Sequence, residues 1–341
     1  MKLSEFMEKW LYDKDGYYAQ YKEIGKKGDF YTSVSSSMFF GGSIAKKLLK
    51  TIKEGFLTEN STVLEIGAHK GYLLADIVQF IFTLEPKLIQ TLKFAILEPQ
   101  PKLQEIQKRY LRESFDDMIK FDFFSSFDEI SLESSFVVAN EIFDAFACEV
   151  VKDDKMLYIN DDLSPYFDKL SPFIKNLSKR YSIKNGEISV GYEEFAKNLS
   201  KSIKRFEFIA FDYGEKEARS DFSLRVYDKH KVYPFFSLTK FAKDDKLMHN
   251  GIDLKSLYKK SDITYDVHFT HLIDAFKNAD IRNTEYMTQM KALVEFGLIE
   301  LLELLKQNSS EKTYLNELNK VKMLIDPAFL GERFKCIIFR K

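Results

Sequence analysis

The stretch that decides the fold is VLEIGAHKG, residues 63–71. It joins a short apolar run to a turn that contains Gly67 and Gly71, and a helix is predicted to follow from residue 72 to 82. Glycine lets a backbone approach a ligand closely, and the free N–H groups at a helix start can bind a carboxylate or a phosphate. We therefore expect a strand, a ligand-binding turn and a helix that belong to an α/β sheet.

Apolar runs and helical stretches alternate on both sides of this segment. The runs are short and rich in β-branched and aromatic residues, which is typical of buried strands. Their alternation with helices predicts a mainly parallel sheet with helices on both faces. Because right-handed crossovers bring the carboxyl ends of the strands to one edge, we expect the ligand there. Helices are predicted at residues 3–12, 39–53, 72–82, 101–112 and 193–203, and strands at 63–66, 94–97, 119–124, 136–139, 206–211 and, as a late edge strand, 334–339.

These patterns divide the chain into three parts. Residues 1–60 are expected to form a helical N-terminal segment. Residues 61–150 and 205–341 are expected to form a Rossmann-like core, with accessory elements for the substrate within residues 215–325. Residues 151–204, rich in Lys, Ser and Asn, are interpreted as an insertion before the fifth strand.

The composition limits the classes of partner. A chain of 341 residues with 45% hydrophobic residues can form a large core. Its 51 Lys and Arg against 52 Asp and Glu leave a net charge of −1, so no overall field favours nucleic acid or an anionic membrane. No apolar stretch approaches the roughly 20 residues of a membrane-spanning helix, and acidic residues near the N-terminus argue against an export signal. With two cysteines and five scattered histidines, we expect a cytoplasmic protein without a metal site.

The spacing within the turn narrows the choice of ligand. A dinucleotide site favours G-x-G-x-x-G, whereas Glu65, Gly67 and Gly71 follow the looser E-x-G-x-x-x-G pattern of a methyl-donor site. Two glycines could equally serve only a tight turn and the packing of a helix against the sheet. The assignment therefore depends on what the other strand ends carry.

Acidic residues at the second and third strands support a nucleoside ligand. Glu98 follows the apolar run 94–97 and precedes Pro99, which ends the strand, so we expect it at the ligand edge. A carboxylate there can hold a ribose diol by two charge-assisted hydrogen bonds, although a surface glutamate is the alternative. Asp122 and Phe123 at the third run could bracket an adenine, or form an ordinary loop.

The fourth run ends in ANEIFDA, residues 139–145, which places Asn140, Glu141 and Asp144 near a transferable methyl group. Methyl transfer is an in-line displacement at carbon, so the protein must chiefly align, desolvate and hold the acceptor. A carboxylate can pair with a guanidinium, which stays charged, and fix its plane. We assign these three residues as catalytic, and Asn140 also to cofactor binding. Alternatively, Asn140 or Asp144 only caps the following helix.

Motifs along nearly the whole chain add a family resemblance. Their order and spacing resemble those of the MidA-type methyltransferases, a family that includes a mitochondrial complex I assembly-factor methyltransferase and many bacterial relatives. The motifs are LYD and GYY within residues 11–18, GDFYTS at 28–33, the turn at 65–71, NEIFDA at 140–145, DYG at 212–214, LR at 224–225 with His230, DIT at 262–264 with Val267 and Phe269, and GERFK at 331–335.

The resemblance implies a fold and a cofactor. The fold is a class I methyltransferase: an α/β, Rossmann-like, mainly parallel sheet with a helical N-terminal segment and an inserted or C-terminal substrate subdomain. The cofactor is S-adenosyl-L-methionine. Gly28, Asp29 and Thr32 resemble the N-terminal loop that covers the cofactor in this family, whereas composition alone predicts a simple Gly-Asp turn.

The resemblance also implies an acceptor. Asp212, Tyr213 and Gly214 resemble the family's segment after the fifth strand, which lines the acceptor pocket, with a strand-terminating turn as the alternative. For the mitochondrial members the acceptor is an arginine on a subunit of respiratory complex I. A protein substrate is therefore expected for this chain.

One position departs from the family pattern. Members commonly carry E-x-G-x-G-x-G, whereas this chain has His69 at the middle glycine, where a side chain could hinder the approach of the cofactor. The main hypothesis is an active protein arginine methyltransferase. The alternative is a catalytically silent assembly factor that kept the fold and holds a partner subunit. Methylation of small molecules or nucleic acid is disfavoured, because the chain lacks an N/D-P-P-Y signature and a basic stripe.

Overall fold

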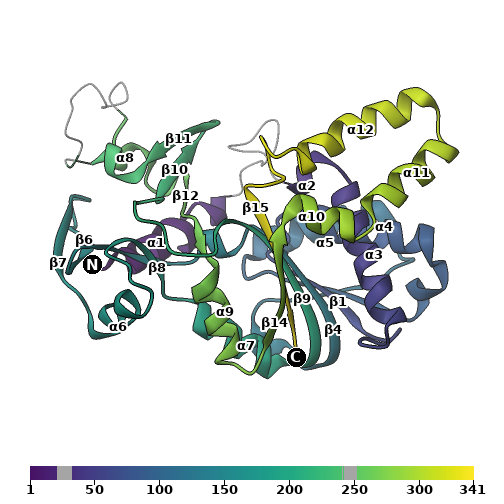
Figure 1. Ribbon diagram of the computed structural model, residues 1–341, viewed down its shortest axis with the longest axis horizontal. Helices are drawn as coiled ribbons and strands as arrows, with labels where there is room; N and C mark the ends of the chain where they lie inside the picture. Colours follow the sequence, from purple (N-terminus) through teal and green to yellow (C-terminus); the bar gives the residue numbers. More distant parts are fainter. Residues whose placement is uncertain (21–32, 240, 242–251) are drawn as a thin grey trace. The chain divides into compact units, whose positions relative to one another are not determined.

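The computed structural model describes residues 1–20, 33–239, 241 and 252–341 (Figure 1). The chain divides into two units, each made of three separate segments. We call one the sheet unit, which comprises residues 32–142, 196–213 and 276–341. The other is the accessory unit, which comprises residues 1–31, 143–195 and 214–275. Three elements continue from one unit into the other: α7 (Tyr192–Ser202), β9 (Ile203–Glu215) and α9 (Phe269–Lys277).

A mainly parallel sheet organises the sheet unit (Figure 1). Its strand order is β14-β15-β9-β4-β1-β2-β3; β3, β2, β1, β4 and β9 run parallel, and β15 and β14 are each antiparallel to their neighbours. Strands buried on both faces read as continuous apolar runs, which is why the sequence predicts them well. The expected class I fold is confirmed. The strand bounds are β1 (Thr62–Ile66), β2 (Lys93–Leu97), β3 (Phe121–Phe124), β4 (Leu132–Asn140), β14 (Arg282–Thr288) and β15 (Phe334–Arg340).

Helices cover both faces of this sheet. On one face Val63 and Phe136 belong to a core shared with α3, α4, α10, α11 and α12. On the other face Phe276 of α9 stacks on Phe208 and Phe339, with ring centroids 5.8 and 3.9 Å apart. The helical bounds are α2 (Ser33–Ser36), α3 (Phe39–Lys53), α4 (Tyr72–Leu84), α5 (Pro101–Phe115), α10 (Gln289–Glu295), α11 (Leu298–Asn308) and α12 (Glu311–Ile325), with short 3-10 turns η2 (Pro86–Gln90) and η3 (Phe127–Glu129).

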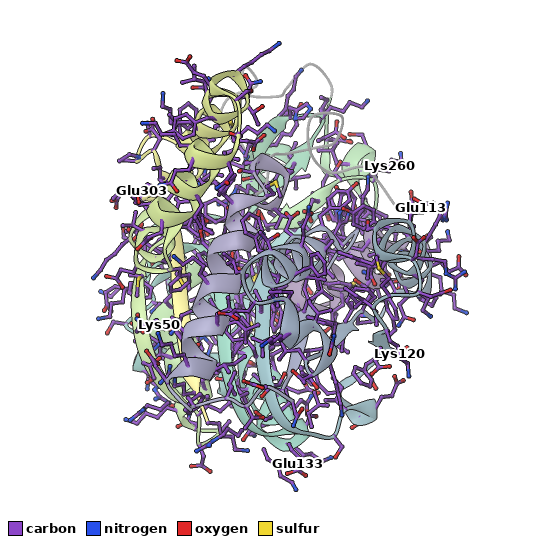
Figure 2. All side chains as sticks on the ribbon, turned by 90° about the vertical axis from the view of Figure 1, so that its right-hand side faces the viewer. Lys50, Glu113, Lys120, Glu133, Lys260 and Glu303 are labelled. Carbon is purple, nitrogen blue, oxygen red and sulfur yellow. The ribbon has the colours of Figure 1, made fainter. Side chains whose placement is uncertain are left out.

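Charged side chains of both signs project from the sheet unit. Figure 2 shows the exposed side chains of Lys50 on α3, Glu113 on α5 and Glu303 on α11. The helices of this unit thus present both signs of charge to solvent, in keeping with the net charge of −1. Within the described ranges, no helix has the length and apolar character needed to cross a membrane.

The accessory unit contains two antiparallel sheets, β7-β6-β5-β8 and β11-β10-β12. Helix α1 buries Phe6 and Trp10 in the core of this unit, and Trp10 Nε1 donates to the main-chain oxygen of Ser261 at 2.6 Å. The bounds are α1 (Leu3–Tyr12), η1 (Tyr18–Gln20), η4 (Phe143–Ala145), β5 (Cys148–Lys152), β6 (Lys155–Ile159), β7 (Pro165–Lys169), α6 (Pro172–Arg180), β8 (Asn185–Ser189), β10 (Arg225–Asp228), β11 (Lys231–Pro234), η5 (Phe235–Leu238), α8 (Leu254–Leu257), β12 (Asp262–Thr264) and β13 (Val267–His268).

Two expectations about organisation differ from the structure. The predicted segment 1–60 is divided at residue 31, because the apolar face of α1 packs on β5 and β6 of the accessory unit. Likewise, residues 151–195 of the predicted insertion belong to the same unit as residues 214–275, although most of their buried apolar residues form a small core of their own.

Strand β15 is not the predicted edge strand. It lies between β9 and β14, and β14 forms the edge. The sequence signal for β14 is weak, because this strand is only half buried and carries several polar residues.

Candidate active site

Three strand ends meet at the carboxyl edge of the sheet, in the order β2, β1 and β4. Ile66, the last residue of β1, pairs with Leu97 of β2 and with Ala139 of β4. The structure therefore brings three of the predicted site residues to one edge. The next residues of the three strands are Gly67, Glu98 and Asn140.

The turn between β1 and α4 has an unusual backbone. Gly67, His69 and Gly71 all have positive φ, of 71°, 46° and 83°. The N–H of Gly67 donates to the main-chain oxygen of Leu97 at 3.1 Å, which ties the turn to β2, and Gly71 is the N-cap of α4. Positive φ is readily available to glycine and uncommon for other residues, with His among the better tolerated. His69 therefore adopts a backbone conformation that glycine adopts more readily.

Glu65 lies under this turn. Its side chain is buried, and Oε2 accepts from the N–H of Leu74 in the first turn of α4 at 3.0 Å. Burial raises the pKa of Glu65 to about 8, and the nearby carboxylates of Asp76 and Glu98 add to the rise. Glu65 thus braces the start of α4, and it holds a proton at neutral pH.

Glu98 is the acid at the end of β2. Its buried carboxylate accepts from the N–H of Gln100 at 3.0 Å and from Nε2 of Gln107 at 3.3 Å. Burial raises its pKa to about 6, and these two hydrogen bonds oppose the rise. At neutral pH the group is therefore mainly ionised, the form that can accept from two hydroxyl groups.

Asn140 and Glu141 follow one another at the end of β4. Nδ2 of Asn140 donates to Oε1 of Glu141 at 2.8 Å, while Oδ1 of Asn140 is buried and has no hydrogen-bond partner among the described residues. Glu141 has a φ of 53°, and its N–H donates to the main-chain oxygen of Phe211 at 2.8 Å. Left-handed backbone at a residue other than glycine is concentrated at functional sites. The pair offers an oriented carboxylate and an unused acceptor.

Gln107 is a site residue that the sequence reasoning missed. It is fully buried on α5, and Nε2 donates both to the main-chain oxygen of His69 at 2.9 Å and to Glu98. Leu103, Gln107 and Leu111 form the buried stripe of α5 at intervals of four residues. A polar residue in the middle of such a stripe was the available signal.

Asp122 and Phe123 lie just before the carboxyl end of β3. Both are inside β3, where Asp122 pairs with Ala95, and the strand continues to Phe124. The exposed carboxylate of Asp122 faces Lys120 at 3.8 Å, and Phe123 packs against the core beneath the ammonium group of Lys108, 5.0 Å from its ring centroid. Alternation along the strand fixes these directions. Their assignment to an adenine stays a prediction.

Asp144 belongs to the accessory unit. It is buried in η4, and its main-chain oxygen accepts from the N–H of Tyr265 at 3.1 Å. Its side chain adds to the rise in the pKa of Tyr18, which is caused chiefly by burial. The three loop residues Gly28, Asp29 and Thr32 lie outside the described residues.

Residues 212–214 lie inside β9, which continues to Glu215, and not after it. Asp212 is fully buried and accepts from the N–H of Tyr213 at 2.9 Å, and the guanidinium of Arg333 lies 5.4 Å from the ring centroid of Tyr213. Gly214 has a φ of 148°, and a Cβ there would lie 2.2 Å from the main-chain oxygen of Val267. Glycine is required at this position because β13 pairs with β9 there. The alternative prediction, a turn that ends the strand at residues 212–214, is thus wrong.

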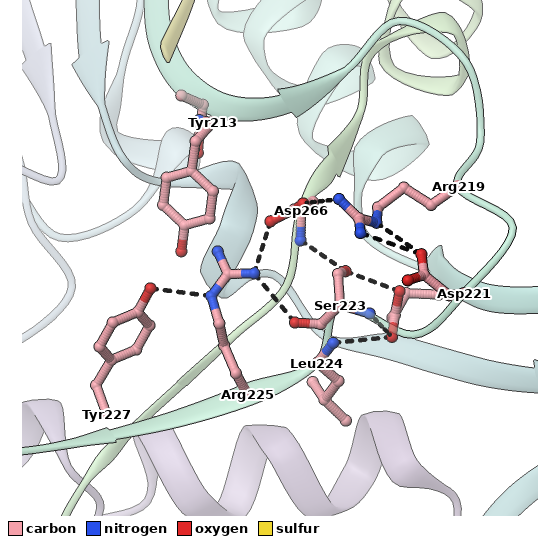
Figure 3. Close-up of polar contacts among 10 residues, drawn as sticks. Tyr213, Arg219, Asp221, Ser223, Leu224, Arg225, Tyr227 and Asp266 are labelled. Atoms are coloured by element: carbon pink, nitrogen blue, oxygen red, sulfur yellow. Dashed lines mark hydrogen bonds and ion pairs between the residues drawn. The ribbon is translucent and has the colours of Figure 1, made fainter. Parts of the chain in front are cut away.

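A second polar network lies within the accessory unit (Figure 3). Nη1 of Arg225 donates to Asp266 at 2.6 Å and to the main-chain oxygen of Ser223 at 3.1 Å, and Nε donates to the hydroxyl of Tyr227 at 2.9 Å. The buried carboxylate of Glu187 accepts from the N–H and the hydroxyl of Ser223. This network joins β8 to the start of β10, so the Leu-Arg motif at residues 224–225 contributes to the architecture of the unit.

Comparison with known proteins adds a family and relatives. Residues 43–287 match the model of a family of S-adenosyl-L-methionine-dependent methyltransferases. The chain is 23% identical to the protein arginine methyltransferase NDUFAF7, mitochondrial, of Rattus norvegicus, in an alignment that covers 97% of this chain and 79% of the relative. The Homo sapiens protein of the same name is also 23% identical, with 97% and 78% covered.

Solved structures agree with the fold. A crystal structure of a protein from Burkholderia thailandensis bound to S-adenosyl-homocysteine has a TM-score of 0.79 and 21% identity, covering 100% of this chain and 88% of that one. A native crystal structure from the same organism has a TM-score of 0.80 and 21% identity, covering 100% and 87%. At this identity the likeness concerns the fold.

Proposed function

Because the chain belongs to the family of S-adenosyl-L-methionine-dependent methyltransferases, we propose that it transfers the methyl group to an arginine side chain of a protein. The observation that carries this proposal is the oriented carboxylate of Glu141 at the carboxyl edge of the sheet, held by Asn140 at 2.8 Å. The two mitochondrial relatives are named protein arginine methyltransferases, which supports arginine as the acceptor.

The residues at the edge fit the cofactor. Ionised Glu98 can accept from the two hydroxyl groups of a ribose, and the N-terminus of α4 offers N–H groups and a positive dipole end to a carboxylate. Oδ1 of Asn140, which has no hydrogen-bond partner among the described residues, can accept from an ammonium group. When bound, S-adenosyl-L-methionine supplies an electrophilic methyl group on a sulfonium.

The acceptor side follows from charge and geometry. A guanidinium stays protonated at neutral pH, so its nitrogen needs a carboxylate that fixes the plane and draws positive charge away from the reacting atom. Glu141 is suited to this role because its backbone conformation and the Asn140 hydrogen bond both restrict its carboxylate. Asp144 and residues 212–214 remain predicted contributors, and a respiratory complex I subunit remains the acceptor suggested by the resemblance.

The test uses the whole chain and a labelled methyl donor. Extracts of cells that lack the protein are incubated with it, and the labelled residue is mapped by mass spectrometry. We expect label on arginine with the wild-type chain and its loss with Glu141→Gln. Label on lysine, nucleic acid or a small molecule would contradict the proposal.

The alternative, a silent assembly factor, rested on His69. Against this argument, His69 has a positive φ of 46°, a backbone conformation that glycine adopts readily, so its replacement of a glycine leaves that conformation available to the turn. A folded Glu98→Ala, Glu141→Ala double variant separates the two: an assembly factor keeps its biological function, and an enzyme loses it.

A further inference from the structure

One buried side chain contacts both parts of the methyl-donor site. The amide nitrogen of Gln107 lies 2.9 Å from the main-chain oxygen of His69 in the turn and 3.3 Å from Oε2 of Glu98. Its Cγ also lies 3.8 Å from the point where a Cβ on Gly71 would be. Gln107 thus connects the glycine turn, the start of α4 and the acid at the end of β2, although it lies on a different element, α5.

The chemistry of the neighbours fixes the orientation of this amide. Both neighbouring atoms, the oxygen of His69 and the carboxylate of Glu98, are acceptors, and the NH₂ group has one hydrogen for each. The reversed orientation would place Oε1 of Gln107 against two oxygens. The assignment of Nε2 therefore follows from charge.

Each of the two contacts opposes a specific cost. Left-handed backbone is unfavourable for a residue other than glycine, and the hydrogen bond to its main-chain oxygen holds His69 in that conformation. Burial disfavours the charged form of Glu98, and the hydrogen bond from Gln107 favours it.

Glu65 from β1 and Asp76 from α4 also lie in this region. Both are carboxyl groups, so neither can supply a positive charge that would stabilise ionised Glu98. Burial raises their pKa values to about 8 and about 7.

We propose that Gln107 is a positioning residue of the donor site, which holds the His69 turn in its left-handed conformation and orients the carboxylate of Glu98 toward the ribose of the cofactor. This role rests on cofactor binding and is independent of the identity of the methyl acceptor. It also explains how the chain dispenses with the middle glycine: a hydrogen bond from α5 supports the conformation that glycine would adopt unaided.

The test measures binding of S-adenosyl-homocysteine to the full chain by calorimetry between about pH 5 and pH 9. Gln107→Met and Gln107→Leu remove the amide donor and replace the glutamine with an apolar side chain of similar size. We expect affinity at neutral pH to fall about tenfold, the loss of one hydrogen bond to a charged group. We also expect the pH at which affinity reaches half its maximum to rise, because Glu98 loses a contact that favours its ionised form.

The matched control is Gln104→Leu. Gln104 lies one turn earlier on α5 and donates to the main-chain oxygen of Glu98 at 2.8 Å, but not to its carboxylate. The Gln104→Leu variant should therefore bind with an unchanged pH midpoint. Thermal unfolding of each variant without ligand separates a binding defect from a folding defect. Unchanged affinity and midpoint in a folded Gln107→Met variant, or an equal midpoint shift in Gln104→Leu, would overturn the proposal.

A second substitution separates the two contacts. In the Gln107→Met background, His69→Gly should restore part of the lost affinity, because glycine adopts left-handed backbone without support. It should leave the pH midpoint shifted, because the contact with Glu98 is still missing. If His69→Gly restores nothing, the role of Gln107 in holding the turn is refuted.

Discussion

Asn140 donates its side-chain amide to the carboxylate of Glu141, the residue that directly follows it, at 2.8 Å. Adjacent residues of a regular strand point to opposite faces, so this contact depends on the left-handed backbone of Glu141, whose φ is 53°. The local strain turns the carboxylate back toward the end of β4. This oriented carboxylate lies beside Oδ1 of Asn140, a buried atom with no hydrogen-bond partner in the part of the chain that the structure describes. From this arrangement we infer where the substrate arginine is held.

Loss of the oriented carboxylate should slow methyl transfer. Asn140→Ala removes the contact with Glu141 and also the acceptor assigned to the cofactor's ammonium group, so we expect the single-turnover rate at saturating cofactor to fall about tenfold to hundredfold. Glu141→Gln should lower the same rate while S-adenosyl-homocysteine affinity, measured by calorimetry, stays at the wild-type value. A Glu141→Gln chain that transfers methyl groups at the wild-type rate would remove Glu141 from the site.

Glu98→Gln should weaken cofactor binding and flatten its dependence on pH. The pKa of Glu98 is about 6, so wild-type affinity for S-adenosyl-homocysteine should decline as the pH falls below that value. The glutamine variant cannot ionise, and it should bind about tenfold more weakly at neutral pH with no such decline. Calorimetry at several pH values checks this, with the exposed Glu113→Gln on α5 as control.

Glu65→Gln should stabilise the protein at alkaline pH. Burial raises the pKa of Glu65 from its ordinary value of 4.5 to about 8, so between these values the folded chain keeps a proton that the unfolded chain has released. The free energy of unfolding of the wild-type chain therefore decreases, relative to that of the glutamine variant, as the pH rises from 4.5 to about 8. The difference should widen by at most about 1.4 kcal/mol per pH unit and then level off. Thermal melts of the wild-type and variant chains at acid and alkaline pH measure this difference in stability. The same difference at both pH values would contradict the raised pKa of Glu65.

The two turn glycines should differ in their tolerance of alanine. Both have positive φ, but a Cβ on Gly67 would lie 2.9 Å from Cγ2 of Ile142, whereas one on Gly71 would meet nothing closer than 3.7 Å. Gly71→Ala should therefore cost about 1 kcal/mol of backbone strain, and Gly67→Ala about 2–3 kcal/mol. Chemical denaturation measures both free energies of unfolding. Equal costs would show that Ile142 yields without penalty.

The sequence predicts the core of the site because strand ends are visible in it. The apolar runs that end at Ile66, Leu97 and Ala139 belong to strands buried on both faces, and their ends define which polar residues share the edge. Glu98 and Asn140 could thus be placed before the structure was known. The end of β3 is also predicted correctly, at residue 124, but Asp122 and Phe123 precede that end, so their assignment to the adenine stays a prediction.

Other features depend on contacts between residues far apart in the chain. Gln107 reaches His69 across 38 positions, and nothing local to α5 indicates its partner. The extent of the accessory unit was equally hidden, because its core joins Trp10, Val150 and Ile263 from three segments. Local periodicity shows that each residue is buried, but not which other segments it meets.

The three-segment construction of the accessory unit has a consequence for synthesis. Helix α1 leaves the ribosome long before β12, yet Trp10 donates to Ser261, 251 positions later. Until then its apolar side chains lack much of their native cover, which favours premature association with other chains or capture by a chaperone. We therefore expect the accessory unit to fold slowly, because its core can form only after residues far apart in the sequence have met.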